Sequence, residues 1–136
     1  MRSYRVEEIE GIGPAYGAKL REAGIPSTSA LLKRCASRKG REEVATTTGI
    51  SETLVLTWTN MADLMRIKGD GKQAAELLQA SGVDTVKELR NRRADNLAAK
   101  MKEVNTAKRL TRATPAEANC IKWIEEAKTL EPIMTY

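Results

Sequence analysis

Apolar side chains recur along this chain at the spacing of an α-helix. Trp58, Met61, Ala62 and Met65 lie four, seven, eight and eleven residues after Leu54, which places all five on one face of a helix. Shorter segments repeat this pattern, and no segment alternates apolar and polar residues over the length of a strand. The pattern predicts an all-α fold of short helices, about five in each half of the chain.

Capping residues and glycines divide the chain into these helices. In the first half, a short helix or turn over residues 4–10 is followed by helices over 14–23, 27–35, 41–48 and 51–65. In the second half, we expect one helix that ends near Gly82, one that starts at Asp84 or Thr85, one that carries Leu97, Met101 and Val104, and one that buries Cys120, Trp123, Ile124, Ala127 and Leu130. Residues 37–40 should interrupt the pattern because Gly40 is a poor helix former. Residues 114–117 (Thr-Pro-Ala-Glu) have the composition of a capping box.

The two halves of the chain are related by an internal repeat. A shift of 58 residues places Gly11 on Gly69 and Gly13 on Gly71. Toward the end of each half the offset becomes 65, and Trp58 then falls on Trp123. A seven-residue insertion between about residues 103 and 115 of the second half reconciles the two offsets. The repeat predicts two units, residues 1–64 and 65–136.

The first of two predicted glycine hairpins precedes a helix near the N-terminus. Gly11 and Gly13 flank Ile12 in a tight turn, and Pro14 follows at a position that suits the start of a helix. Such a turn directs free backbone amides and the positive end of a helix dipole toward one point, which favours a phosphate. We therefore predict a phosphate site at Gly11, Ile12 and Gly13, with Lys19 within reach of a flanking phosphate.

The spacing of this hairpin resembles that of the helix-hairpin-helix family. Ile9, Gly11, Gly13, Gly17 and Leu20 match the family pattern, with Gly17 where alanine is usual. The resemblance implies binding to the backbone of nucleic acid without reading of its sequence. Three carboxylates (Glu7, Glu8 and Glu10) precede the turn and would repel a phosphate. The alternative is a tight connector whose apolar tip is buried in the core.

The second hairpin departs from the pattern of the first. Lys68, Gly69, Asp70, Gly71 and Lys72 form it, and Asp70 stands where an apolar residue belongs. This carboxylate occupies the place of an anion, although Lys68 and Lys72 could offset its charge. We expect the two lysines and two glycines to contribute to nucleic-acid binding, or the copy to be structural only.

Positive charge is concentrated in the second half of the chain. The chain carries a net charge of +5, whereas residues 87–112 contain nine basic and three acidic residues, a net +6 that leaves about −1 elsewhere. The basic residues are Lys87, Arg90, Arg92, Arg93, Lys100, Lys102, Lys108, Arg109 and Arg112. Such a patch is typical of a protein that binds a polyanion, and a solvated helix face is the alternative. We predict contacts from Arg90, Arg92, Arg93 and Arg109.

Composition argues against a metal centre, an enzyme and a membrane protein. The chain has no histidine, and its two cysteines, Cys35 and Cys120, lie far apart, so we expect free thiols and neither a metal nor another cofactor. Catalytic acid–base pairs are not evident among the carboxylates, and no small-molecule substrate is implied. No segment reaches the roughly 18 apolar residues of a membrane span, and the N-terminus lacks a signal sequence. We expect a cytoplasmic protein whose two tryptophans, Trp58 and Trp123, are core residues.

Over essentially its full length, the chain resembles an uncharacterised bacterial domain-of-unknown-function family of tandem helix-hairpin-helix proteins. The segments that carry the resemblance are residues 7–13, 49–51, 62–71 and 80–89. The resemblance implies a duplicated helix-hairpin-helix fold packed into a helical domain.

Two functional hypotheses follow from these observations. In the first, the chain is a non-enzymatic module that binds the phosphate backbone of double-stranded DNA without sequence specificity, through the hairpins and the basic segment. In the second, the hairpins are structural and the helices present a surface to a protein partner or to a second copy of the chain. Asp70 and the acidic flank of the first hairpin favour the second hypothesis.

Overall fold

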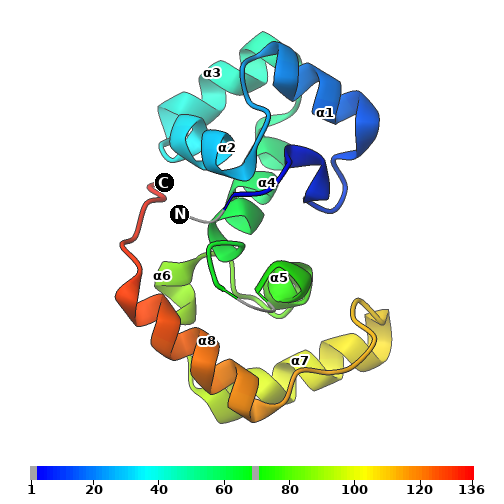
Figure 1. Cartoon of the computed structure of the whole chain (residues 1–136), viewed down its shortest axis with the longest axis vertical. Coiled ribbons are helices and arrows are strands. Elements are labelled where there is room, and N and C mark those ends of the chain that lie inside the picture. Colours follow the sequence, from blue (N-terminus) through cyan, green and yellow to red (C-terminus); the bar gives the residue numbers. More distant parts are fainter. Residues whose placement is uncertain (1–2, 69–70) are drawn as a thin grey trace. The chain divides into compact units, whose positions relative to one another are not determined.

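The computed structural model describes residues 3–68 and 71–136, with the side chains of Gly71 and Lys72 left out. Its elements are a 3-10 helix, η1 (Val6–Glu8), and eight α-helices: α1 (Gly13–Glu22), α2 (Thr28–Cys35), α3 (Arg38–Thr48), α4 (Glu52–Leu64), α5 (Gly71–Ala80), α6 (Val86–Leu89), α7 (Ala94–Lys108) and α8 (Glu117–Thr129) (Figure 1). An isolated bridge between Arg5 and Ser27 is the one extended pairing in the described part. The all-α prediction is therefore confirmed for the described residues. Four α-helices lie in each half.

The chain divides into two compact units. The first comprises Met1–Arg66 together with Ile133–Tyr136, and the second comprises Ile67–Pro132. In the first unit α2 packs against α3 and α4, and in the second α8 packs against α6 and α7. Each unit has its own aliphatic core and one large buried aromatic residue, Trp58 at 2% and Trp123 at 4% exposure. Both tryptophans are core residues, as predicted.

Helix positions in the two units follow the two sequence offsets. Helices α1 and α5 are related by 58 residues at both ends, and α4 and α8 by 65. The turn after the first helix of each unit is also equivalent. Gly24 and Gly82 adopt left-handed φ angles of 84° and 94°, and Ser27 and Thr85 cap the next helix through their hydroxyl oxygens. Equivalent residues therefore build equivalent local structure.

The insertion in the second half lies around the end of α7. Helix α7 has 15 residues against 11 in α3. Residues 109–116 connect α7 to α8, whereas residues 49–51 suffice between α3 and α4. We call residues 109–116 the insertion loop. It has no counterpart of similar length in the first unit.

Helix α3 begins earlier than its sequence suggests. Residues 37–40 were expected to interrupt the helical pattern, but Ser37 caps a helix that starts at Arg38, and its hydroxyl oxygen accepts the Gly40 N–H at 3.1 Å. Gly40 lies in the first turn because a Cβ there would overlap the Arg34 carbonyl oxygen. The glycine serves close packing between chain segments, and the prediction of a break was wrong.

The capping box predicted at residues 114–117 does not form. Helix α8 begins at Glu117, and no side chain caps it. The Thr114 hydroxyl oxygen instead accepts a hydrogen bond from the Asn105 side-chain amide at 3.2 Å. Asn105 is buried in place of the expected Val104, which is half-buried. Leu54 and Leu130 are likewise half-buried, and the other expected core residues of α8 are buried.

A buried arginine fixes the C-terminal residues on the first unit. The Arg41 guanidinium donates to the carbonyl oxygens of Cys35, Ala36 and Thr135 at 2.9, 3.0 and 2.8 Å. The Tyr136 ring lies over the same guanidinium, with 5.4 Å from Cζ to the ring centroid. Two carbonyls at the end of α2 thus gain a charged donor in place of water.

Replacement of Arg41 by methionine should destabilise the first unit. The change keeps the aliphatic bulk but leaves three carbonyl oxygens without their donor, and we expect the free energy of unfolding to fall by roughly 2–3 kcal/mol. Urea unfolding followed by circular dichroism measures this loss. Arg38→Met is the matched control, because Arg38 is exposed and forms only a surface ion pair with Glu42 at 3.2 Å. Equal losses in the two variants would contradict this role of Arg41.

Candidate nucleic-acid interface

The first hairpin forms the turn that the sequence predicts. Gly11 and Gly13 have φ angles of 92° and 61°, which residues with a side chain rarely adopt. Ile12 is buried at 2% exposure, and its N–H donates to the Ile9 carbonyl at 3.3 Å. Within the described residues, the amides of Gly11 and Gly13 donate no hydrogen bond. The glycine amides are thus the free donors of the turn, whereas Ile12 holds it to the core.

An aromatic pair supports this hairpin from the interior. A Cβ at Gly11 would lie 3.7 Å from Trp58 Nε1. The rings of Tyr16 and Trp58 are 5.1 Å apart between centroids and inclined by 60°, a favourable tilted arrangement. Trp58 therefore anchors the start of α1 as well as the core of α4.

Two of the three carboxylates beside the hairpin have partners. Glu7 accepts from Arg21 Nε and Nη2, both at 2.7 Å, and this bidentate contact lowers the pKa of Glu7 to about 2. Gly17 leaves room for it, because a Cβ there would lie 2.6 Å from Glu7 Oε2. Glu8 accepts the Arg5 N–H at 3.0 Å. Only Glu10 is exposed without a bond in the described part of the hairpin region, so the repulsion of a phosphate is weaker than the sequence suggests.

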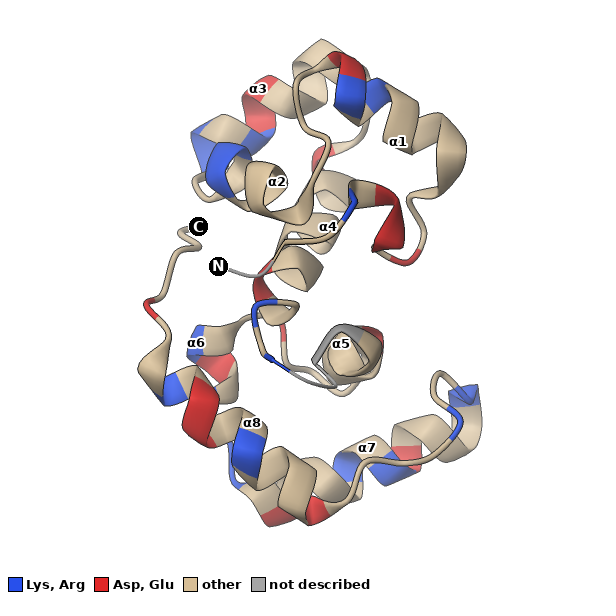
Figure 2. Ribbon diagram, viewed as in Figure 1, with Lys and Arg blue, Asp and Glu red and all other residues tan. Residues whose placement is uncertain are grey.

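Lys19 is displaced from the hairpin. It is exposed and lies in the last turn of α1, six residues beyond Gly13 and therefore about 9 Å further along the helix axis. Figure 2 shows the charged residues of α1 near its C-terminal end. Lys19 and the glycine amides thus form two separate contact points.

The second predicted hairpin falls mostly outside the described residues. Gly69 and Asp70 are not described, nor are the side chains of Gly71 and Lys72. Lys68 is exposed, and its backbone N–H donates to a carboxylate oxygen of Glu126 at 2.9 Å. Phosphate binding by this hairpin stays a prediction.

Every carboxylate of the basic segment has an ion-pair partner within the segment. Glu88 pairs with Arg92 at 3.3 Å, Asp95 with Arg93 at 3.0 Å and Glu103 with Lys100 at 3.8 Å. The other six cations form no ion pair with the described residues, and we call them the unpaired cations. They are Lys87, Arg90, Lys102, Lys108, Arg109 and Arg112.

Arg92 and Arg93 have local structural partners. Arg92 Nη2 donates to the Gly82 carbonyl at 2.8 Å, and Arg34, which is 58 residues earlier, donates to the Ala23 carbonyl at 3.1 Å. Both arginines close the turn that follows the first helix of their unit. The bidentate contact between Arg93 and Asp95 lowers the pKa of Asp95 and raises that of Arg93. Of the four predicted arginines, Arg90 and Arg109 remain unpaired.

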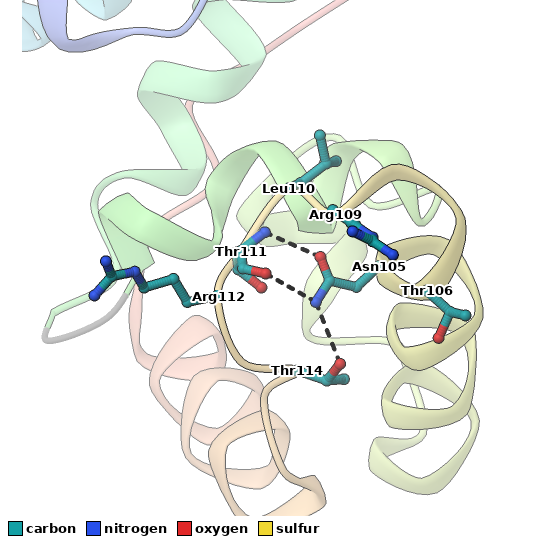
Figure 3. Close-up of a pocket in the computed structure, with 7 residues that line it drawn as sticks. All are labelled: Asn105, Thr106, Arg109, Leu110, Thr111, Arg112 and Thr114. Carbon is teal, nitrogen blue, oxygen red and sulfur yellow. Dashed lines mark hydrogen bonds between the residues drawn. The ribbon is translucent and has the colours of Figure 1, made fainter.

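The C-terminal end of α7 and the insertion loop surround a cavity of about 640 Å³ (Figure 3). Lysine and arginine gather along this stretch in Figure 2. The lining residues are Asn105, Thr106, Arg109, Leu110, Thr111, Arg112 and Thr114, none of them acidic. In Figure 3 the Arg109 guanidinium lies beside Asn105, and Arg112 extends away from it. Neither the cavity nor its organising residue, Asn105, was predicted from the sequence.

A second basic cluster was also not predicted from the sequence. Residues 33–41 contain five basic residues and no acid, and Figure 2 shows positive charge at the junction of α2 and α3. Arg34 and Arg41 bind carbonyl oxygens and Arg38 pairs with Glu42. Lys33 and Lys39 alone remain exposed without a partner among the described residues. A local charge count would have found this cluster.

Neither cysteine points to chemistry at a site. Cys35 and Cys120 are buried free thiols, and burial raises the pKa of both. The expectation of free thiols is confirmed. Across residues 3–68 and 71–136, no group of three or more potential ligands gathers as a metal site would require, and no helix has the length and apolar character to cross a bilayer.

The fold and these charges define a duplicated, all-helical protein with a basic surface in its second unit. A family model for a domain of unknown function, DUF4332, matches residues 10–130. The chain therefore belongs to the DUF4332 family. No curated protein and no solved structure matches it.

The carboxyl group of Glu7 should titrate far below an ordinary glutamate. Its pKa is about 2 in the folded chain against an ordinary 4.5, so the stability that it contributes is complete above about pH 4.5 and is lost as the pH falls toward 2. Carboxyl NMR titration measures this pKa. In Arg21→Gln the pKa should return toward 4.5, whereas Lys19→Gln, an equal charge change on the same helix, should leave it low. An unchanged pKa in Arg21→Gln would disprove the assignment.

Proposed function

We propose that this chain is a non-enzymatic module that binds the sugar-phosphate backbone of double-stranded DNA without sequence specificity. The observation that carries the proposal is the set of six unpaired cations in the second unit. Cations already paired with carboxylates lose a partner when they bind phosphate, whereas unpaired cations lose only water and counterions. Contacts to phosphate fix position but convey no base information.

Four of the unpaired cations lie at the end of α7 and in the insertion loop. Lys102 and Arg109 are seven residues apart, with Thr106 between them, and therefore lie on one side of α7. Lys108 and Arg112 extend the basic surface along the chain. An extended group of separate cations suits successive phosphates of a strand better than one compact anion.

The first hairpin offers a second contact of a different kind. In this proposal, residues 9–20 act as the hairpin of a bacterial helix-hairpin-helix unit, and the free amides of Gly11 and Gly13 donate to a phosphate oxygen. The N-terminal end of α1 adds its dipole. The Arg21 guanidinium offsets the charge of Glu7 beside it.

A specific observation favours the second candidate function, a protein-interaction module. Ile121 on α8 is 49% exposed, whereas the equivalent Leu56 on α4 is half-buried. A large exposed aliphatic side chain is a common element of a protein interface. A mass that rises with concentration, together with no affinity for DNA, would favour this candidate.

Removal of unpaired cations should flatten the salt dependence of DNA binding. Fluorescence anisotropy of a labelled mixed-sequence duplex, titrated at several salt concentrations, gives the slope of log K against log salt. Each lost phosphate contact should reduce that slope by about 0.9, so Lys102→Gln with Lys108→Gln should reduce it by about 1.8.

The matched control is Arg38→Gln with Lys128→Gln. Both residues are exposed and already paired, with Glu42 and Glu125 at 3.2 and 2.9 Å, and the loss of charge is the same. A slope that falls equally in the two double variants would mean that net charge alone governs binding. No binding of the unaltered chain at low salt would reject the proposal.

Substitution of Gly13 by alanine should weaken DNA binding through the hairpin. A methyl group at this left-handed position strains the turn and lies at the tip that a phosphate must approach. Gly49→Ala is a matched control, since Gly49 has a φ of 75° and, as at Gly13, an added Cβ would meet no atom within 4 Å. Both changes should cost about 1–2 kcal/mol of stability, but only Gly13→Ala should lower the affinity, measured below its unfolding temperature. Equal affinities in the two variants would remove the hairpin from the interface.

A further inference from the structure

Two cavities of different chemistry adjoin the insertion loop. The first is the 640 Å³ cavity that contains Arg109 and Arg112. The second, of about 370 Å³, is lined by Gln73, Ala74, Thr111, Ala113, Thr114, Pro115, Ala116, Asn119 and Trp123. Thr111 and Thr114 line both cavities, so the loop is a wall between a cationic side and a largely apolar side.

One buried side chain holds this wall in place. Asn105, at 7% exposure, donates through Nδ2 to the Thr111 carbonyl at 3.1 Å and to the Thr114 hydroxyl at 3.2 Å. Its Oδ1 accepts the Thr111 N–H at 2.9 Å (Figure 3). Three hydrogen bonds from one amide fix the separation of the cavities. The site is therefore formed before any ligand arrives.

Arg109 occupies an unusual backbone conformation at the edge of the cationic cavity. Its φ of 52° and ψ of 48° are left-handed, and it is the one non-glycine residue with positive φ in the described chain. Gly49 ends the equivalent helix of the first unit in the same conformation without strain. An arginine kept where glycine is the easier choice suggests a use for its guanidinium.

A ligand that fills both cavities must carry an anion at one end and a compact apolar group at the other. A nucleoside monophosphate has this form, with its phosphate toward Arg109 and its base against Trp123 and Pro115. The volumes lie within the usual range of ligand pockets. We propose that the insertion loop binds a nucleoside monophosphate unit, either free or at the end of a nucleic-acid strand. This pocket does not depend on duplex binding and has a separate test.

The two tryptophans supply a reporter in each unit. In the ¹⁵N-labelled chain, the indole N–H of Trp123 reports on the apolar cavity and that of Trp58 on the first hairpin, and Trp58→Phe assigns the two signals. Titration with thymidine 5′-monophosphate should shift the Trp123 signal and leave the Trp58 signal unmoved. No shift of Trp123 would overturn the proposal.

Comparison ligands divide the nucleotide into its parts. Thymidine and inorganic phosphate should each bind at least about tenfold more weakly than the monophosphate, since each lacks one of the two contacts. Equal affinity for inorganic phosphate would overturn the role of the apolar cavity, and equal affinity for thymidine would overturn that of Arg109. A 5′-phosphorylated oligothymidylate that binds more tightly than the monophosphate supports the strand end as source, and equal binding supports the free nucleotide.

Arg109→Gly tests the cationic side without risk to the fold. The glycine relieves the left-handed strain, so the urea midpoint should stay the same or rise, while affinity for thymidine 5′-monophosphate should fall about tenfold. Lys128→Gln, an equal charge loss at an ion-paired site of the same unit, should preserve that affinity. Unchanged affinity in Arg109→Gly would overturn the proposal. The duplex slope of the Lys102 and Lys108 double variant is independent of this result, so the two proposals fail separately.

Discussion

The structure depends on a hydrogen-bonded corner that is built once in each unit. A left-handed glycine ends the first helix, the next amide (Ile25 or Val83) returns to a carbonyl of that helix at 2.8 or 2.9 Å, and a hydroxyl caps the second helix. An arginine, Arg34 or Arg92, completes the corner by binding a carbonyl of the turn. Because buried backbone groups must be paired, these residues fix where each helix pair turns. The side chains that perform this structural task have already committed their donors.

This commitment separates the cations that shape the fold from those that can bind a ligand. Arg41 and Arg92 are structural donors to carbonyls, and Arg93 is held by Asp95. A charge count along the sequence treats all three like Lys102 or Arg109. Pairing in three dimensions distinguishes them, and this distinction moves the proposed interface toward the end of α7. A polyanion partner is favoured there because the carboxylates of the segment are all engaged by other cations.

Helix starts and ends were largely predictable from sequence because their causes are local. Ser27, Ser51 and Gly49 act within a few residues of their own positions. Prediction failed where a distant partner decides the outcome. Gly40 is a glycine because the Arg34 carbonyl is close, and Thr114 gives its oxygen to Asn105 rather than to its own helix. The first hairpin was recognisable from its glycines, but the pocket of the insertion loop was not, since it depends on one buried amide.

The duplication and its interruption have different consequences. Equivalent helices give each unit the same framework, which explains why α1 and α5, or α4 and α8, keep equal lengths. A framework repeated without change would offer two similar surfaces. The seven extra residues change this, because they replace a short glycine turn by a loop that carries Arg109 and Arg112 near a buried asparagine. The loop needs no change in the surrounding core, since Asn105 satisfies its backbone groups from within α7. A new surface was therefore compatible with the old fold, and the difference between the units is where a function specific to this chain is best sought.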